Sequence, residues 1–325
     1  MNALDLRWIV PVLAILGVQY FVALLIGVQL DFSYEVPFRS FGVVGLNFAI
    51  IGFCLPVVWQ LFRFWREGEQ NPLRRILPRL PWALAVGFLL VACQFAVLNW
   101  AKVMMPAAVG FWADPAFADL DHLLFGQDPW RLSHQYLGQA TPVIDKIYGF
   151  WAPVNFAILL FLFYLPPSPK RAQALIAYFL AWAGGTLGQY LGASAGPIFY
   201  ESIQLGDRFA ELPVSPWTAT AREYLWTNYL KGGGLIGAGI SAMPSMHVAI
   251  ALWIALVGRT FLPRYQVIFW AYFATILVGS VHLGWHYAVD GIAASVIVPV
   301  VWVIAGTMAT TTLNKQRQPE PSIET

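Results

Sequence analysis

The chain has 325 residues, of which 58% are hydrophobic and only 11% are charged, and its net charge at pH 7 is +2. So little charge cannot cover the surface of a water-soluble domain. A balance this close to neutral also gives no reason to expect nucleic acid as a partner. The composition therefore indicates an integral membrane protein.

The apolar residues are grouped in blocks, and a bilayer span needs roughly 20 mostly apolar residues. Backbone polar groups inside a bilayer must be paired within their own segment, so each block is predicted to be a helix. The predicted fold is all-α, a polytopic membrane helix bundle of about eight transmembrane helices. The blocks are residues 8–30, 41–62, 82–105, 147–165, 172–192, 244–262, 265–283 and 286–309.

Lys and Arg are more numerous in the loops on the N-terminal side of these spans, although the loops on the other side are longer. An excess of positive charge marks the cytoplasmic side. Both termini are therefore predicted to be cytoplasmic, and the long loops to face the periplasm, the outside or a lumen. The first block is too long for a signal-peptide core and lacks a small-residue cleavage site, so we expect a retained span.

Three regions are predicted along the chain. Residues 1–81 form an N-terminal accessory unit of two spans with a basic cytoplasmic loop at 63–81. This loop either sets the topology or attracts anionic lipid head groups. Residues 82–312 form a catalytic core of six spans, and the polar residues 313–325 form a disordered cytoplasmic tail.

The core contains two long outward segments, 106–145 and 193–243. In the first, apolar residues alternate with aspartates, and Phe117, Leu120 and Leu124 fit one face of a helix. This pattern is typical of an amphipathic helix at the membrane interface, which either covers a lipid-binding site or is purely structural. The second segment is too rich in aromatic residues to be disordered.

Two polar clusters interrupt the last third of the chain. The second one contains His286 and Asp290 at a spacing of i, i+4, which places them on one face of a helix. Helical side chains lean toward the N-terminus, so Asp290 can accept a hydrogen bond from one nitrogen of His286. The other nitrogen is then free as a nucleophile or base. The alternative is a buried polar pair that only holds helices together.

The first cluster, Ser241 to His247, follows a glycine-rich run at 232–239. His247 lies at the beginning of a predicted span. Pro244 suits the first turn of this helix, and Ser241 or Met243 precedes Pro244. The free amides of a helix N-terminus bind phosphate, a glycine-rich backbone can approach an anion, and Ser245 adds a hydroxyl donor. His282, one turn before His286, is either a third catalytic or phosphate-binding group or an interfacial residue that caps its span.

A metal site is the alternative interpretation of these residues. His247, His282, His286 and Asp290 are all ligand types. The sequence has no closely spaced ligand pair such as H-E-x-x-H, and a nucleophile with its orienting acid explains His286 and Asp290 better. We therefore predict neither a metal nor a cofactor.

These motifs resemble the type 2 phosphatidic acid phosphatase (PAP2) superfamily. Pro244-Ser245-Met246-His247 is similar to its second motif, P-S-G-H, and His286-Tyr287-Ala288-Val289-Asp290 to the end of its third, H-x-x-x-D. The H-Y-x-x-D form looks more like the lipid phosphotransferase branch, which includes inositol phosphorylceramide synthase and, more distantly, sphingomyelin synthase. The resemblance is strong only in the last third of the chain.

The resemblance implies a six-helix core and a metal-independent mechanism in two steps. His286 attacks phosphorus and forms a phosphohistidine, Asp290 orients it, and His247 protonates the leaving oxygen. Water or an alcohol then resolves the intermediate. The partners implied are a phospholipid donor and a lipid or small-alcohol acceptor.

The chain departs from the phosphatase pattern at three positions. Gln189, Gly196 and Ser280 stand where that pattern has cations. The phosphate would then depend on the helix N-terminus and on the loop cations Arg208, Arg222 or Lys231, among which the sequence does not choose. Fewer cations suit a phosphodiester, with one negative charge, better than a monoester with about two.

The sequence-based hypothesis is therefore a polytopic lipid phosphotransferase, similar to inositol phosphorylceramide synthase and active at the non-cytoplasmic face. A lipid phosphate or polyprenyl diphosphate phosphatase of the same superfamily is the alternative within this class. A lipid transporter or scramblase with a degenerate site is the alternative that is not an enzyme.

Overall fold

A computed structural model describes residues 5–32, 35–67, 82–233 and 235–317, and the ordered elements in these ranges are all helices. Their bounds are α1 (Leu6–Gln29), α2 (Phe38–Glu67), α4 (Trp82–Val109), α5 (Asp114–Phe125), α6 (Pro129–Leu137), α7 (Thr141–Gly149), α8 (Trp151–Tyr164), α9 (Pro169–Gly188), α10 (Pro216–Leu230), α11 (Met246–Phe261), α12 (Gln266–His282) and α13 (Ala288–Arg317). The all-α prediction is confirmed.

Each of the eight apolar blocks of the sequence lies in a helix: α1, α2, α4, α8, α9, α11, α12 and α13. Within the described residues, four helices are long and apolar enough to cross a membrane on their own, namely α1, α4, α12 and α13. A fifth span is possible if α6 to α8, bent by 43°, crosses as one broken unit. The prediction of a polytopic helical membrane protein is confirmed. Helix length and apolar composition support four or five spans among the described residues, where eight were predicted.

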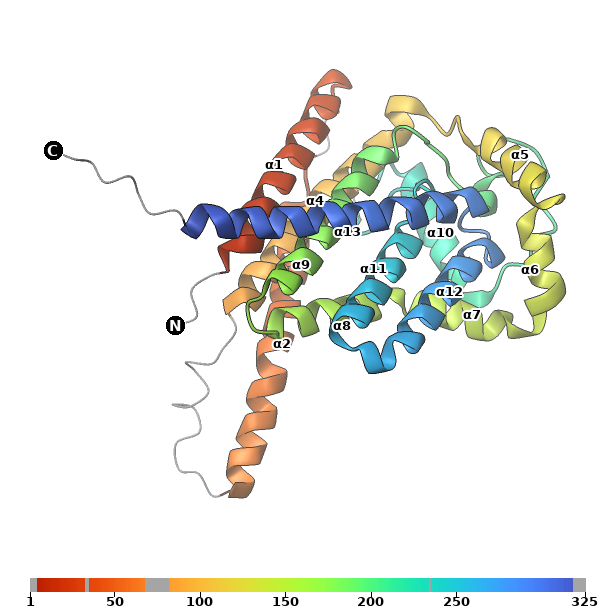
Figure 1. The fold of residues 1–325 in the computed structure, drawn as a ribbon. Coiled ribbons are helices and arrows are strands. Elements are labelled where there is room, and N and C mark those ends of the chain that lie inside the picture. Colours follow the sequence, from red (N-terminus) through yellow and green to blue (C-terminus); the bar gives the residue numbers. More distant parts are fainter. Residues whose placement is uncertain (1–4, 33–34, 68–81, 234, 318–325) are drawn as a thin grey trace.

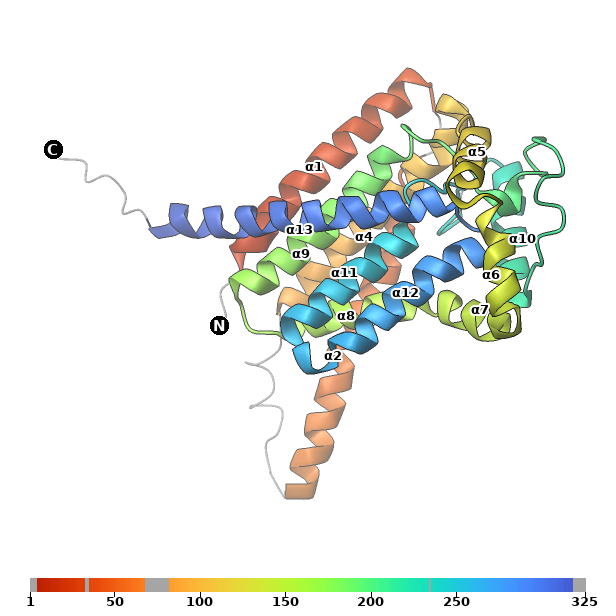
Figure 2. The same cartoon turned by 45° about the vertical axis from the view of Figure 1, so that its right-hand side comes forward.

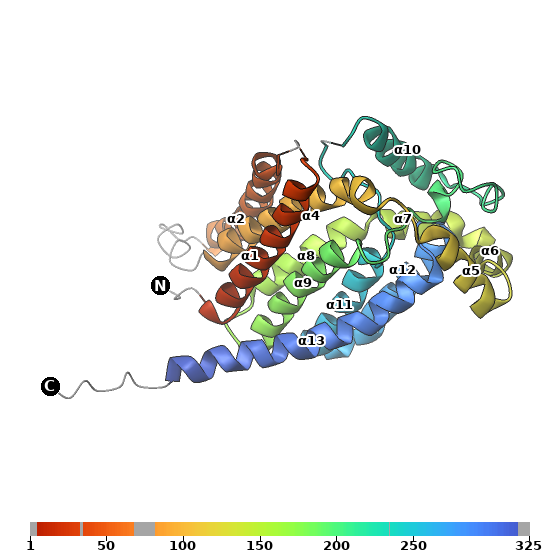
Figure 3. The same ribbon diagram turned by 90° about the horizontal axis from the view of Figure 1, so that it is seen from above.

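The long helices lie side by side, and the short helices gather at one end of them (Figures 1 and 2). α5, α6, α7 and α10 form this end, which we call the loop end (Figure 3). α12 ends and α13 begins there, whereas α1 begins and α13 ends at the opposite end. The two polar clusters of the sequence are thereby brought to the same part of the molecule.

The centre of the bundle is formed by α9 and α11, whose small residues allow close helix packing. A Cβ at Gly185 of α9 would contact Met246 of α11, and one at Gly258 of α11 would contact Phe269 of α12. The indole Nε1 of Trp253 on α11 donates to the carbonyl of Ala174 on α9 at 2.8 Å. These contacts fix the start of α11, which carries His247.

A buried polar network joins the N-terminal helices to the core. Gln94 of α4 donates to Gln19 of α1 at 3.0 Å, and Gln19 donates to Thr186 of α9 at 2.8 Å. Interhelical hydrogen bonds of this kind hold membrane helices in register. The boundary predicted between an accessory unit at 1–81 and a core at 82–312 stays a prediction.

Three sequence-based assignments fall partly outside the described residues. These are residues 68–81 of the predicted basic loop, Gly234 of the glycine-rich run, and residues 318–325 of the predicted tail. α13 extends to Arg317 and so into the segment that was predicted to be a disordered tail. The long segment 193–243 is not disordered where it is described, because it contains α10.

Candidate active site

The start of α11 places His247 in the first helical turn. Ser245 is the N-cap residue, and its Oγ accepts a hydrogen bond from the amide of Val248 at 3.4 Å. Pro244 lies just before the N-cap residue and not in the first helical turn, as was predicted for it. The hydroxyl of Ser245 is fully buried under the helix end, so it supports the helix instead of facing an open space.

The imidazole of His247 is held between two aromatic rings. Tyr148 stacks on it with ring centroids 4.6 Å apart and an interplanar angle of 14°, and Trp151 lies at 4.4 Å. The Trp151 indole Nε1 also donates to the His247 carbonyl at 3.1 Å. Both aromatic residues come from the α7–α8 region, so this bent segment orients the His247 side chain.

His286 lies in the connection between α12 and α13, one turn before Asp290. Its backbone amide donates to the carbonyl of Ser280 at 3.1 Å, which fixes the connection. Its Nδ1 lies 3.4 Å from Oδ2 of Asp290, and the same oxygen accepts from the Tyr287 amide at 3.0 Å. The two groups are close enough for an ion pair, but Nδ1 is buried without a hydrogen bond to a described residue, so the predicted hydrogen bond stays a prediction. Only Asp290 is on the helix. Because Nδ1 faces the carboxylate, Nε2 is the nitrogen left for chemistry.

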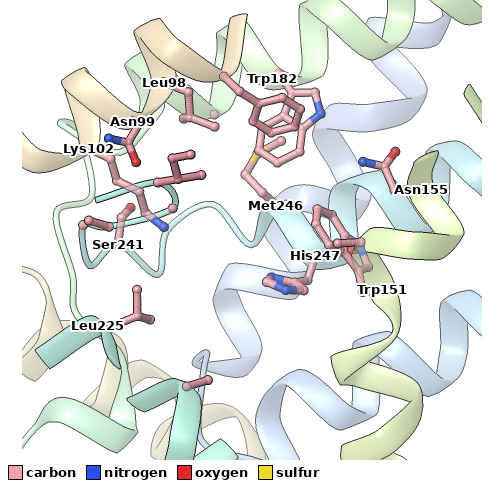
Figure 4. A pocket seen from close by; sticks show the side chains of 18 of the residues that line it. Leu98, Asn99, Lys102, Trp151, Asn155, Trp182, Leu225, Ser241, Met246 and His247 are labelled. Carbon is pink, nitrogen blue, oxygen red and sulfur yellow. The ribbon is translucent and has the colours of Figure 1, made fainter. Parts of the chain in front are cut away.

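The two histidines face one another across a shared space. Their ring centroids are 6.1 Å apart, so both rings can reach one phosphoryl group placed beside them. Both line a cavity of about 660 Å³. Figure 4 shows His247 pointing into this cavity beside Trp151. The structure therefore brings together His247, His286 and Asp290 from the two polar clusters.

Most of the cavity wall is apolar and aromatic, and it extends well beyond the histidines. Phe41 and Phe48 of α2 line it together with Phe88 and Phe95 of α4 and Trp182 of α9. The wall also contains polar residues, which include Asn99, Lys102, Asn155 and Gln189. A long apolar space with a small polar region is suited to an amphiphilic ligand.

Two buried carboxyl groups of α5 hold the backbone around the site. Asp121 accepts from the amides of Ala288 and Val289 at 2.6 and 3.0 Å, at the start of α13. These amides would otherwise be unpaired, because the first four amides of a helix have no partner within it. Asp121 thus holds the N-terminus of the helix that carries Asp290.

Asp114 fixes the neighbouring loop. It accepts from the amides of Ala195 and Gly196 at 2.7 and 2.9 Å, and from the hydroxyl of Tyr287 at 2.7 Å. Burial raises the pKa of Asp114 and of Asp121 to about 6, although the amide donors act in the opposite direction. Burial next to Asp114 also raises the pKa of Tyr287, which keeps its hydroxyl protonated as a donor.

A helix predicted in 106–145 is present as α5, but its aspartates are not all on the solvent side. Asp114 and Asp121 are buried, whereas Leu123 and Leu124 are 79% and 55% exposed. The helix therefore turns its carboxylates inward, toward backbone amides, and its leucines outward, where lipid can contact them.

The other predicted phosphate-binding residues do not line the cavity. Arg208 donates to the carboxylates of Asp119 and Asp128 and to the carbonyl of Ala118. Arg222 donates to Ser202 at 3.2 Å, and Lys231 follows the last residue of α10. Their roles in phosphate binding stay predictions, and the observed contacts are structural.

His282 is buried away from the two other histidines of the motifs. Its Nε2 lies 2.8 Å from the hydroxyl of Thr141, and its Nδ1 lies 3.0 Å from that of Ser133. Its ring stacks on His134 with centroids 3.8 Å apart. These contacts join the end of α12 to α6 and α7, so the geometry favours the structural alternative for His282.

Neutral residues stand at the three positions where the phosphatase pattern has cations, and each of them contacts the surrounding protein. The Gln189 side-chain amide donates to the carbonyl of Thr186 at 2.8 Å, and the hydroxyl of Ser280 donates to that of Leu277 at 2.8 Å. Gly196 has φ +97°, and a Cβ there would strike the Trp285 carbonyl.

Sequence reasoning did not identify Lys102 as a residue of the site, although it lines the cavity with both histidines. The signal was available, because Lys102 is the only charged residue between Trp82 and Val109. Sequence reasoning also did not identify Tyr148 and Trp151. Aromatic residues are common in apolar blocks, so their presence there does not point to a site. Among the described residues, no group of three His, Cys, Asp or Glu side chains is arranged to hold a metal ion.

Comparison with known proteins finds one family whose sequence pattern matches the part of the chain that carries the candidate site. Residues 115–304 match the PAP2 superfamily, which is more than half of the chain and includes His247, His286 and Asp290. The helices α1, α2 and α4 lie before the matched region. No curated protein and no solved structure matches the chain.

Proposed function

The chain belongs to the PAP2 superfamily, and from this premise we propose that it is an integral-membrane lipid phosphotransferase that works through a phosphohistidine. Membership supports a phosphatase or phosphotransferase type of function in a membrane. The observation that carries the finer proposal is the joint placement of His247 and His286 on one cavity, with Asp290 beside Nδ1 of His286.

In the first proposed step, Nε2 of His286 attacks phosphorus, and the bond from phosphorus to the lipid oxygen breaks. His247 gives its proton to that oxygen, so a neutral lipid alcohol leaves and a phosphohistidine remains. In the second step His247 takes a proton from an acceptor hydroxyl, whose oxygen attacks phosphorus. The P–N bond breaks, and its electron pair returns to His286. Proton transfer of this kind contributes about 10²–10⁴ in rate.

The lipid character of the substrate is supported by the cavity. Its wall combines the two histidines and a few other polar residues with aromatic residues of α2, α4 and α8. A phosphate group at the histidines would leave an acyl chain in the apolar part. The proposed substrate is a phosphodiester of the glycerophospholipid type, because the three neutral positions Gln189, Gly196 and Ser280 leave few cations for a doubly charged monoester.

The proposed site faces the non-cytoplasmic side of the membrane. Two observations support this orientation: the excess of Lys and Arg in the loops on the N-terminal side, and the position of the loop end opposite the start of α1 and the end of α13 (Figure 1). In this orientation the acceptor is a lipid or small alcohol of the outer or lumenal leaflet.

The intermediate can be tested with the full-length protein in detergent and a phospholipid labelled with ³²P. We expect acid-labile label on the protein, and its loss in His286→Ala. Asp290→Asn should lower kcat by about 10–100-fold with KM little changed, because it disturbs the orientation and charge of His286 rather than lipid binding. Asp207→Asn is the control, because it makes the same change at an exposed aspartate of the segment 193–243, and it should behave as the wild type.

Product analysis separates the proposed activity from its alternatives. Appearance of the labelled head group on an added ceramide or diacylglycerol acceptor supports transfer. Release of the phosphorylated head group to water alone, with no transfer to any acceptor, would instead indicate a hydrolase, and release of free phosphate from a lipid phosphate monoester would indicate a phosphatase. A transporter would move lipid between leaflets equally well in the wild type and in His286→Ala, and neither protein would turn lipid over.

A further inference from the structure

We propose that Lys102 of α4 binds the phosphate of the substrate lipid, and that a helix before the family-matched region thereby completes the site. This inference rests on the proposed function, because it assigns a binding residue to the same cavity. Lys102 lies before the family match at 115–304, so the match itself gives it no role.

Lys102 is placed to meet a ligand that also contacts the histidines. Its side chain and that of His247 point into the cavity from different walls (Figure 4). Lys102 is within electrostatic reach of His247. Asn99, one helical turn earlier on α4, faces the same space and offers an amide next to the ammonium group.

The charge of Lys102 is not balanced by the protein. Among the described residues that line the cavity it is the only lysine or arginine, and Asp145 is the only carboxylate. Asp145 is already engaged, because it accepts from the Trp217 amide at 3.1 Å and the Thr218 hydroxyl at 2.9 Å. The ammonium group of Lys102 makes no hydrogen bond or ion pair with another described residue.

An ammonium group inside a span is costly and is typical of a substrate or ion pathway. A lysine near the end of a span can also extend toward water at the interface. Here the side chain is turned into the cavity that contains His247 and His286. The missing counter-charge is therefore best supplied by an anion in that cavity.

The glycine-rich run of the sequence explains how this orientation is held. Gly239 has φ +98°, and a Cβ there would come within 3.1 Å of the Lys102 side chain and backbone. A Cβ at Gly233, where φ is +85°, would lie 2.5 Å from Val103. The backbone at Gly233 and at Gly239 therefore lies directly against α4, and Gly239 covers the stem of Lys102. This leaves the cavity as the direction open to the ammonium group.

The chemistry of the ligand follows from this arrangement. One ammonium group and one neutral amide match the single negative charge of a phosphodiester. Lys102 would donate to a non-bridging oxygen of the phosphate, and no bond to Lys102 is made or broken during the reaction. The three neutral motif positions, Gln189, Gly196 and Ser280, are then compensated by one cation from another helix.

Binding can be measured without turnover in the full-length His286→Ala protein in detergent. The probes are dioctanoyl phosphatidylglycerol, a phosphodiester, and dioctanoylglycerol, which has the same tails and no phosphate. Lys102→Met in this background should raise the Kd for the phosphodiester by about 10–100-fold, the range for a hydrogen bond to a charged group. The Kd for dioctanoylglycerol should not change, and Lys102→Arg should retain most of the phosphodiester affinity.

Lys146→Met is the matched control, because Lys146 is an exposed lysine of α7 that does not line the cavity. An equal loss of affinity for both probes in Lys102→Met would show a structural role and overturn the proposal, as would unchanged affinity for both. Turnover of the wild type and of His286→Ala tests the proposed function separately. If His286→Ala turns lipid over normally, the mechanism fails, yet the difference between the two probes still decides the role of Lys102.

Discussion

Gly196 occupies a point where the loop before α10 touches the backbone that carries His286. Its φ of +97° lies in a region that other residues rarely adopt, and a Cβ would strike the carbonyl of Trp285. Its amide donates to Asp114 at 2.9 Å. The phosphatase pattern has a cation here, and the structure gives a physical reason for its absence, since no side chain fits.

Gly196→Ala is therefore expected to damage the site, and Gly206→Ala provides a matched control. Gly206 has φ +101° with open space around it, so its alanine variant meets only the backbone strain, about 1–2 kcal/mol. Gly196→Ala adds a steric conflict of about 1–3 kcal/mol and shifts His286. Denaturation in detergent should show the larger loss of stability, and turnover should fall, only for Gly196→Ala. Equal effects of the two variants would contradict this account.

At this scale the sequence predicted which three polar side chains belong to one candidate site, but not what surrounds them. The spacing of His286 and Asp290 and the placement of His247 at a helix start were sufficient to bring these three residues into one hypothesis. Lys102 could not be placed in the same way. Its helix is apolar on all sides, so periodicity does not show which face turns toward a cavity.

At the scale of elements, α5 is held to the rest of the protein by carboxylates that face inward. The sequence shows aspartates alternating with apolar residues, which is compatible with a helix that turns its acids toward water. The structure shows the reverse for Asp114 and Asp121, because the amides at Ala195–Gly196 and Ala288–Val289 need acceptors where water is excluded. These amides are brought next to α5 only by the packing of distant segments. The local sequence pattern therefore could not show that the two aspartates face inward.

The pKa of Asp121 leads to a prediction about pH. Burial, followed by the nearby charges of Asp290 and Asp128, raises it to about 6 in the folded protein, from an ordinary value of 3.8. A raised carboxyl pKa stabilises the fold below the ordinary value, and this contribution is lost as the pH rises through 6. The difference in melting temperature between the wild type and Asp121→Asn should therefore be largest near pH 4 and decrease toward pH 7.

The asparagine variant should also be less stable at every pH, because its NH₂ group cannot accept from the second amide at the start of α13. Asp207→Asn changes an exposed aspartate and should show no such trend with pH. A difference that grows as the pH rises would mean that the pKa of Asp121 is lowered rather than raised, and would contradict this interpretation.

The helices themselves were predictable to a much greater extent than their contacts. All eight apolar blocks are helical, because apolar composition and the need to pair backbone groups act locally along the chain. The α6–α8 region was harder to predict. Its 43° bend puts Tyr148 and Trp151 around His247, and that arrangement depends on α11, which begins about a hundred residues later in the sequence.

At the scale of the whole molecule, the cavity does not belong to the family-matched region alone. The match begins at residue 115, whereas Phe41, Val44 and Phe48 of α2 line the same cavity as His247. Phe48 stacks on Phe156 of α8 with ring centroids 4.2 Å apart. Helix α2 therefore forms part of the cavity wall, in addition to packing against the core.

This arrangement predicts that α2 influences which acyl chains are accepted. Val44 lines the cavity, and its neighbour Val43 is 55% exposed on the outside of the same helix. Val44→Trp should fill part of the apolar space and shift the preference of kcat/KM toward shorter acyl chains, by roughly tenfold for a loss of one or two buried methylenes. Val43→Trp adds the same side chain outside the cavity and should leave the preference unchanged.

The measurement is turnover of a series of phospholipids that differ only in acyl chain length, compared between the two variants and the wild type. A uniform loss of activity in Val44→Trp at all chain lengths would indicate general damage to the site rather than a shorter cavity. The same shift in both variants would place the effect at the lipid-facing surface of α2. Only a shift confined to Val44→Trp fits a cavity in which the histidines hold the phosphate and α2 contacts the far part of the chain, because Val44 alone of the two lines that space.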